Sequence, residues 1–113
     1  MKKKFERVVL LNDFYGALLT EKQTDALRLH YENDWSLAEI ADSFGSSRQA
    51  VHDLIRRSND ALENYEQQLG FVDKYNSNRQ LLQEALSLLQ EKPLDDSKLE
   101  RINDLLLRLQ QSI

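Results

Sequence analysis

Two features of composition and one of patterning predict an all-α fold for this chain of 113 residues. Glycine occurs three times and proline once, so few tight turns are available, whereas a β-sandwich or barrel requires many. Leu, Glu, Gln, Lys, Arg and Asp dominate, and most of these residues tolerate a helix well. No segment alternates apolar and polar residues over a sustained stretch, so we expect no β-strands.

Helix-start signals divide the chain into segments. Three capping boxes, each a Ser or Thr followed three residues later by Glu or Gln, are expected at positions 20–23, 36–39 and 46–49. Pro93 followed by Asp95, Asp96 and Ser97 marks a break and a further helix start. We therefore expect six helices, over approximately residues 2–18, 21–32, 37–43, 47–69, 73–91 and 96–111.

Residues 36–57 carry the spacing of a helix-turn-helix. Ala41 is the small residue that lets two helices cross closely, and Gly45 can adopt the positive φ that the turn needs. Val51, six positions after the glycine, returns a branched apolar side chain to the crossing. The other positions expected to be buried are Ile40, Phe44 and Leu54.

A DNA-binding version of this motif places the N-terminal part of its second helix in the major groove. Arg can donate two hydrogen bonds to guanine and Gln two to adenine, so polar residues on that helix are candidate base contacts. The candidates for base edges are Arg48, Gln49, His52 and Arg56. The candidates for phosphate contacts, which a helix start and a flanking cation can make, are Ser46, Ser47 and Arg57.

The charge balance supports a second interpretation. The formal net charge is -4, and residues 20–64, which contain the motif, hold five basic and nine acidic residues. Accumulated negative charge weakens phosphate binding. A protein-interaction module that does not read DNA sequence is therefore the alternative to a DNA-binding regulator.

The C-terminal part of the chain predicts self-association. Gly70 is expected to separate a helix-turn-helix domain, residues 1–70, from a helical dimerisation or packing region, residues 71–113. Two leucine-rich helices joined around Pro93 should form a helical hairpin, and a second copy could cover its excess apolar surface in a homodimer. In the alternative, the hairpin covers the motif within one chain. The last helix carries a continuous apolar stripe of Leu99, Ile102, Leu105, Leu106, Leu109 and Ile113.

Several other classes of function lack a signal in the sequence. There is no glycine-rich phosphate loop, no His pair at metal-ligand spacing and no ordered Ser–His–Asp pattern, so we predict no enzyme, no cofactor and no metal. No apolar run approaches the roughly 18 residues of a membrane span, so we expect no membrane insertion. The absence of cysteine suits a reducing cytoplasm, where we expect the protein to reside.

Residues 19–69 contain a set of residues whose types and spacing match a known pattern: Thr20, Gln23, Leu27, Tyr31, Ser36, Glu39, Ile40, Ala41, Ser47, Arg48, Gln49, Ala50, Val51, Asp53, Ile55 and Arg57. With these residues the segment resembles region 4 of bacterial sigma factors, and it resembles the YlxM-like family of short bacterial helix-turn-helix proteins more closely. That family also has a helical tail of this length, so the resemblance covers nearly the whole chain. This chain departs from sigma region 4 at Asp53 and Asp60, which flank Arg56. In sigma region 4 the corresponding face is typically basic.

The genes of the YlxM-like family stand beside those of the signal recognition particle GTPase. The resemblance therefore implies regulation of that pathway. Either reading of the motif, as a DNA-binding regulator or as a module that contacts a protein or ribonucleoprotein, fits such a role.

Overall fold

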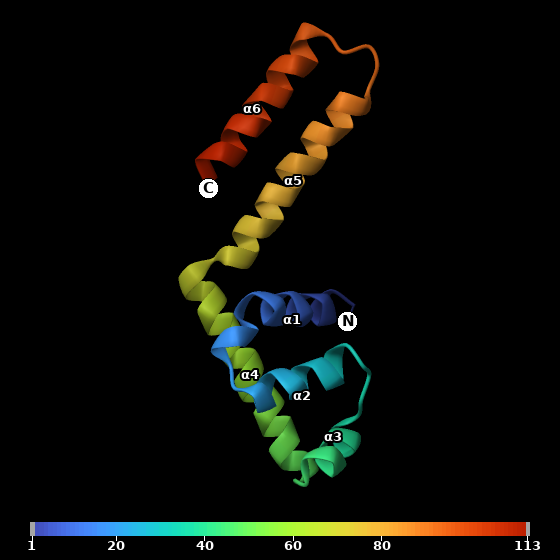
Figure 1. The fold of residues 1–113 in the computed structure, drawn as a ribbon, viewed down its shortest axis with the longest axis vertical. Helices are drawn as coiled ribbons and strands as arrows, with labels where there is room; N and C mark the ends of the chain where they lie inside the picture. Colours follow the sequence, from blue (N-terminus) through green and yellow to red (C-terminus); the bar gives the residue numbers. More distant parts are fainter. Residues whose placement is uncertain (1, 113) are drawn as a thin grey trace. The chain divides into compact units, whose positions relative to one another are not determined.

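The computed structural model describes residues 2–112 and the side chains of residues 5–112, so Ile113 of the predicted stripe lies outside it. All regular secondary structure in that part of the chain is helical (Figure 1), which confirms the all-α class. None of its helices is both long and apolar enough to cross a membrane. The elements are α1 (Lys2–Tyr15), the 3-10 helix η1 (Gly16–Leu18), α2 (Glu21–Tyr31), α3 (Leu37–Phe44), α4 (Arg48–Leu69), α5 (Phe71–Gln90) and α6 (Asp96–Ser112).

The helices belong to two compact units, residues 1–72 and 73–113. The first unit contains α1 to α4 and the first two residues of α5, and the second contains the rest of α5 and α6. The assignment of residues 1–70 and 71–113 to separate domains stays a prediction.

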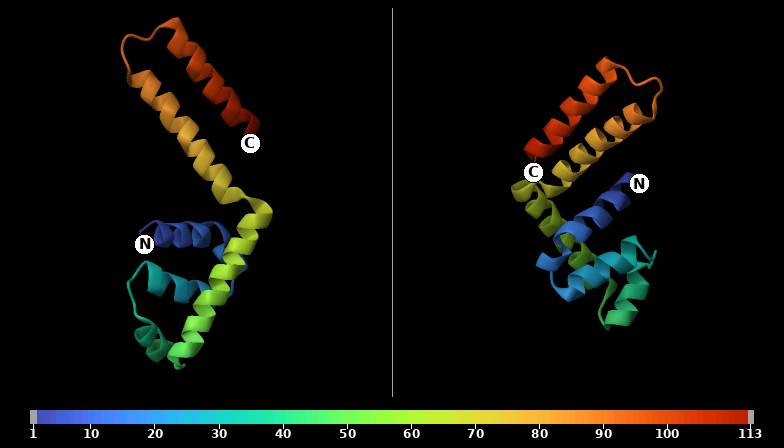
Figure 2. Two further views of the ribbon diagram at one scale, coloured as in Figure 1. Left: turned by 180° about the vertical axis from the view of Figure 1, so that it is seen from behind. Right: turned by 45° about the horizontal axis from the view of Figure 1, so that its top comes forward.

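The first unit is assembled on α4. Its buried residues recur every three or four positions, so they form one face, and α1, α2 and α3 lie against it (Figure 2). Ile40, Ala41 and Val51 meet in the core, as the helix-turn-helix spacing predicts, whereas Phe44 and Leu54 are half-buried at its edge. The buried core of this unit consists of Val8, Leu11, Tyr15, Ala26, Leu27, Ile40, Ala41, Val51, Ile55, Leu62 and Val72.

Two of the three predicted capping boxes are present. The hydroxyl of Thr20 accepts from the Gln23 N–H, and the Gln23 side chain accepts from the Thr20 N–H. Ser36 and Glu39 form the same reciprocal pair at the start of α3. These interactions span three residues, which explains why spacing alone predicted both helix starts.

The prediction of a third capping box at Ser46 and Gln49 is wrong, because the N-cap of α4 lies one residue later. Gly45 ends α3 with a φ of 66°, and the Ser46 N–H donates to the Ala41 carbonyl at 3.0 Å. Ser46 therefore completes the end of α3, and Ser47 becomes the N-cap of α4. The Ser47 hydroxyl accepts from the Ala50 N–H at 3.0 Å.

A buried polar group sets the start of α5 at Phe71 rather than at the predicted residue 73. The Tyr15 hydroxyl donates to the Glu66 carboxylate, which also accepts from the Val72 N–H at 3.0 Å. The Phe71 N–H donates to the Tyr15 hydroxyl oxygen at 3.1 Å. Two first-turn amides of α5 thus gain acceptors, which stabilises an earlier start. Burial and the hydrogen bond to Glu66 raise the pKa of Tyr15.

The second unit is the predicted helical hairpin. α5 and α6 run antiparallel, side by side (Figures 1 and 2), with Ala85, Ile102 and Leu105 buried. The Arg101 guanidinium binds the Glu84 carboxylate at 2.9 Å. Of the three polar residues predicted to start α6, Asp95 is the cap, because its carboxylate accepts from the Lys98 N–H at 2.8 Å.

Tyr15→Phe should reduce the free energy of unfolding by about 1–3 kcal/mol, because it leaves the buried Glu66 carboxylate without one donor and the Phe71 N–H without its acceptor. Urea unfolding followed by circular dichroism measures the change. Tyr65→Phe is the matched control: Tyr65 is half-buried and its hydroxyl makes no hydrogen bond to any residue that the structure describes, so the change should stay within about 0.5 kcal/mol. Equal losses in the two variants would contradict the role of Tyr15.

Candidate functional site

The candidate site is the α3–α4 turn and the N-terminal half of α4. Val51 and Ile55 hold the inner side of this segment in the core. All seven residues predicted to contact DNA are exposed, so one segment presents them together: Ser46, Ser47, Arg48, Gln49, His52, Arg56 and Arg57. Their contact with DNA stays a prediction.

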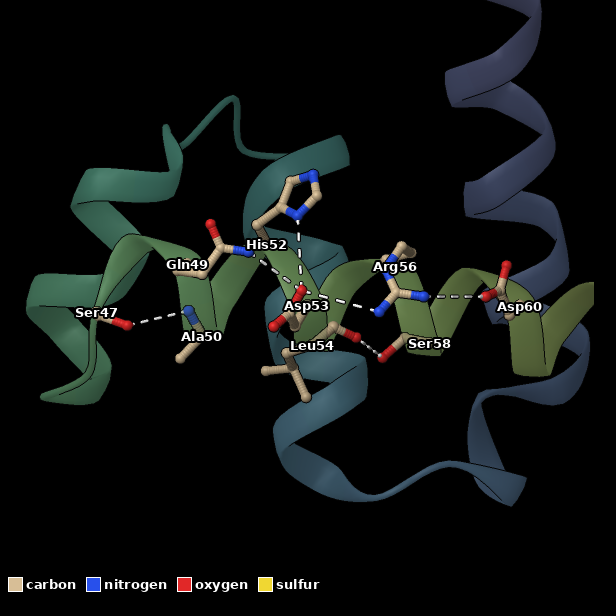
Figure 3. A network of polar contacts seen from close by, with 9 residues as sticks. All are labelled: Ser47, Gln49, Ala50, His52, Asp53, Leu54, Arg56, Ser58 and Asp60. Atoms are coloured by element: carbon tan, nitrogen blue, oxygen red, sulfur yellow. Dashed lines mark hydrogen bonds and ion pairs between the residues drawn. The ribbon is translucent and has the colours of Figure 1, made fainter.

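The face of α4 opposite the core carries Gln49, Asp53, Arg56 and Asp60, which we call the outer ridge. Asp53 lies at its centre (Figure 3). The Asp53 carboxylate lies 3.4 Å from Gln49 Nε2, 3.8 Å from Arg56 Nη2 and 3.9 Å from Nδ1 of the neighbouring His52. Arg56 Nη1 also lies 3.9 Å from Asp60 Oδ2. Three of the predicted base-contacting side chains thus have an acidic neighbour on their own helix.

These contacts are weak. The distances are at the long end for hydrogen bonds and ion pairs, and the participating side chains are more than two-fifths exposed. An exposed ion pair contributes about 0.2–1 kcal/mol. A partner that offers stronger hydrogen bonds can therefore displace Asp53 from Gln49 or Arg56.

The predicted phosphate-contacting residues differ in what they already bind. The Ser47 hydroxyl oxygen is the cap of α4, and the Ser46 N–H is used at the end of α3, although the Ser46 side chain is exposed. Arg48 and Arg57 form no ion pair with any residue that the structure describes. Of the three arginines at this site, only Arg56 is already paired with carboxylates.

A groove between α2 and α4 contains one candidate residue that sequence reasoning missed. Lys22, in the first turn of α2, lines it together with Ser46 and Arg57. The Lys22 ammonium also lies 5.7 Å from the centre of the Phe44 ring. We call this the α2–α4 groove; its lining residues are Thr20, Lys22, Gln23, Ser46, Ala50, Val51, Asp53, Leu54 and Arg57. Helical spacing carries no signal that relates Lys22 to Arg57, because the two residues lie on different helices.

A second groove lies on the other side of α4, toward α1 and α2, and His52 and Arg56 contribute to its wall. Arg7 spans it to Glu63 through two hydrogen bonds of 2.8 Å, and this bond to Arg7 lowers the pKa of Glu63. His30 Nδ1 lies 2.9 Å from the Trp35 carbonyl, which can only accept, so Nδ1 carries the proton. Among the described residues, no three His, Cys, Asp or Glu side chains gather to hold a metal.

Comparison with known proteins relates the whole arrangement to one family. Residues 1–110 match the model of the UPF0122 family, described as "Putative helix-turn-helix protein, YlxM / p13 like". A UPF0122 protein of Symbiobacterium thermophilum is 51% identical over 96 residues, which cover 85% of this chain and 90% of the relative. A UPF0122 protein of Shouchella clausii is 42% identical over 111 residues, which cover 98% of each chain.

Ser47→Ala should lower the free energy of unfolding by about 1 kcal/mol, because it removes the hydroxyl that accepts from the Ala50 N–H. Urea unfolding followed by circular dichroism measures the change. Ser46→Ala provides a matched control on the neighbouring residue, whose hydroxyl is outside the cap, and should shift stability by less than about 0.5 kcal/mol. A larger loss for Ser46→Ala would restore the predicted cap at Ser46.

Proposed function

Because the chain belongs to the YlxM/p13-like family of helix-turn-helix proteins, we propose that it binds duplex DNA through the N-terminal half of α4 and regulates transcription. The observation that carries this proposal is the division of α4 into two sides. The core holds the inner side in place, while the first turns expose Arg48, Gln49 and His52 together. A helix supported in this way can enter the major groove without reorganising the fold. This role places the protein in the cytoplasm.

The outer ridge determines how such binding would work. Arg48 has no carboxylate to release, whereas Gln49 and Arg56 must leave Asp53 before they contact a base edge. Asp53 itself repels phosphate but can accept a hydrogen bond from the amino group of cytosine. The affinity should therefore be modest, and its salt dependence should come mainly from the unpaired cations.

A second candidate function is a contact with a protein or ribonucleoprotein of the signal recognition particle pathway. The carboxylates of Asp53 and Asp60 on the outer ridge favour it, since they complement a basic partner surface. The two functions predict opposite effects of one change. Removing the charge of Asp53 should strengthen the binding of DNA and weaken the binding of a basic protein.

We also propose that the second unit forms a homodimer. A hairpin of two helices has a single shared interior, where Ala85, Ile102 and Leu105 are buried, and the leucines on its other faces stay exposed within this unit. A second copy that presents the same leucines would close a symmetric helical bundle. The leucines that stay about half exposed are Leu82 (46%), Leu86 (57%) and Leu89 (46%) on α5, and Leu99 (49%), Leu106 (51%) and Leu107 (47%) on α6.

Asp53→Asn should strengthen DNA binding by about 1 kcal/mol, or roughly fivefold, the interaction of two unit charges about 4 Å apart in water. Arg48→Ala combined with Arg56→Ala should weaken it. Fluorescence anisotropy at low salt, with labelled duplexes from genomic fragments, measures both changes.

Glu100→Gln is the control for net charge, because it removes one exposed carboxylate from α6 and should leave DNA affinity unchanged. DNA binding that does not respond to the double arginine variant would refute the proposed use of α4. A parallel titration with the purified particle GTPase and its RNA tests the second candidate. Binding there that weakens in Asp53→Asn, together with no retention of DNA, would favour the second function.

Leu86→Lys combined with Leu106→Lys should convert the protein from a dimer to a monomer, because two charges would be buried at the contact. Light scattering during size-exclusion chromatography should give twice the 13.2 kDa chain mass for the unchanged protein and the chain mass for the variant. Leu94→Lys is the control, since Leu94 lies between α5 and α6 and outside the helical faces. A monomeric unchanged protein at high micromolar concentration would exclude the dimer.

A further inference from the structure

We infer that the α2–α4 groove is a binding site for a phosphate of the DNA backbone, with Lys22 and Arg57 as its two cations. This inference rests on the proposed DNA binding. It adds a specific anchoring site beside α4, and it gives a function to Lys22, on a helix that precedes the motif.

The pairing of the cations in the first unit points to this groove. Arg7, Arg28 and Arg56 each pair with carboxylates. Among the side chains that the structure describes in this unit, those cations without a carboxylate partner are Lys22, Arg48 and Arg57. Two of these three line one groove, although they come from different helices.

The remaining polar groups of the groove are mostly donors. Gln23 uses its side-chain oxygen in the capping box of α2, so its amide nitrogen keeps its hydrogens for another acceptor. The exposed Ser46 hydroxyl can also donate. With Lys22 and Arg57, the groove offers donors from α2, from the α3–α4 turn and from α4 around an apolar floor that includes Val51 and Leu54.

The acidic groups near the groove do not neutralise its cations by direct contact. Asp53 is the one carboxylate among the lining residues, and its contacts are with Gln49, His52 and Arg56 (Figure 3). Glu21 and Asp25 share a neighbouring depression with Lys22, but neither forms an ion pair with it. The groove lining thus has two cations and one carboxylate, whereas the chain as a whole has a net charge of -4.

The position of the groove favours a phosphodiester over a free phosphate ion. A helix in the major groove has a sugar–phosphate backbone on either side, and contacts to that backbone fix its register. The α2–α4 groove runs beside α4 at the level of Ala50 and Leu54, next to the residues proposed to contact bases. Cations on the two walls can hold a phosphate of a strand that passes between them.

The test is the salt dependence of duplex binding by Lys22→Gln, Arg57→Gln and the double variant. Each lost phosphate contact should reduce the slope of log K against log salt concentration by about 0.9. The double variant should therefore lose nearly 2 units of slope if each cation contributes one contact. Arg56→Gln is the matched control on the same helix: because Arg56 is already paired with Asp53 and Asp60, its slope should change less.

The outcomes separate the two levels of the proposal. Duplex binding by the unchanged protein, with an unaltered slope in the double variant, would overturn the groove and leave the proposed function standing. No retention of the duplex by the unchanged protein would overturn both. Inorganic phosphate supplies the second arm, by nuclear magnetic resonance titration: saturation of the Ser46 and Arg57 amide shifts at micromolar phosphate would assign the groove to a free ion and overturn the backbone contact. Weak, unsaturated shifts alongside a reduced duplex slope would support it.

Discussion

The burial of one face of α4 is the constraint on which the first unit depends. Val51, Ile55 and Leu62 lie in a core that α1, α2 and α3 complete, so the rotation of α4 about its axis is fixed by packing. Rotating the helix would expose these side chains and bury charged ones, which is strongly unfavourable. Everything on the outer ridge, including the placement of Gln49 and Arg56, follows from that rotation.

The same rotation creates a competition on the surface. Asp53 lies among the polar side chains that a nucleic acid would use, close enough to bind them but too exposed to bind them tightly. The cations that are available to a partner are therefore Arg48, Arg57 and Lys22, which lie outside the outer ridge. A site of this kind depends on flanking phosphate contacts for affinity and on a few side chains for selectivity. Such flanking contacts would allow a chain with a net negative charge to bind DNA through a helix-turn-helix.

The second unit differs from the first in how much apolar surface it leaves exposed. Its hairpin buries Ala85, Ile102 and Leu105 but leaves six leucines of α5 and α6 about half exposed, so within this unit the apolar surface exceeds the interior that holds it. In the first unit, by contrast, the start of α5 is held by hydrogen bonds, because Tyr15 and Glu66 accept from the amides of Phe71 and Val72. Buried hydrogen bonds thus mark the end of the first unit, whereas exposed leucines characterise the second.

Local patterns in the sequence are enough to predict the helical class, two of the capping boxes, the αL glycine of the turn and the exposed side of α4. These features depend on residues three to seven positions apart, which helix geometry relates directly. Even the neighbours of Asp53 follow from that spacing. The three-dimensional arrangement was needed to show that Ser47 rather than Ser46 caps α4, that α5 begins at Phe71, and that Lys22 shares a groove with Arg57. The start of α5 and the groove depend on contacts between residues distant in sequence. The cap at Ser47 depends on how the Gly45 turn uses the Ser46 amide. The spacing of residue types carries no signal for either kind of contact.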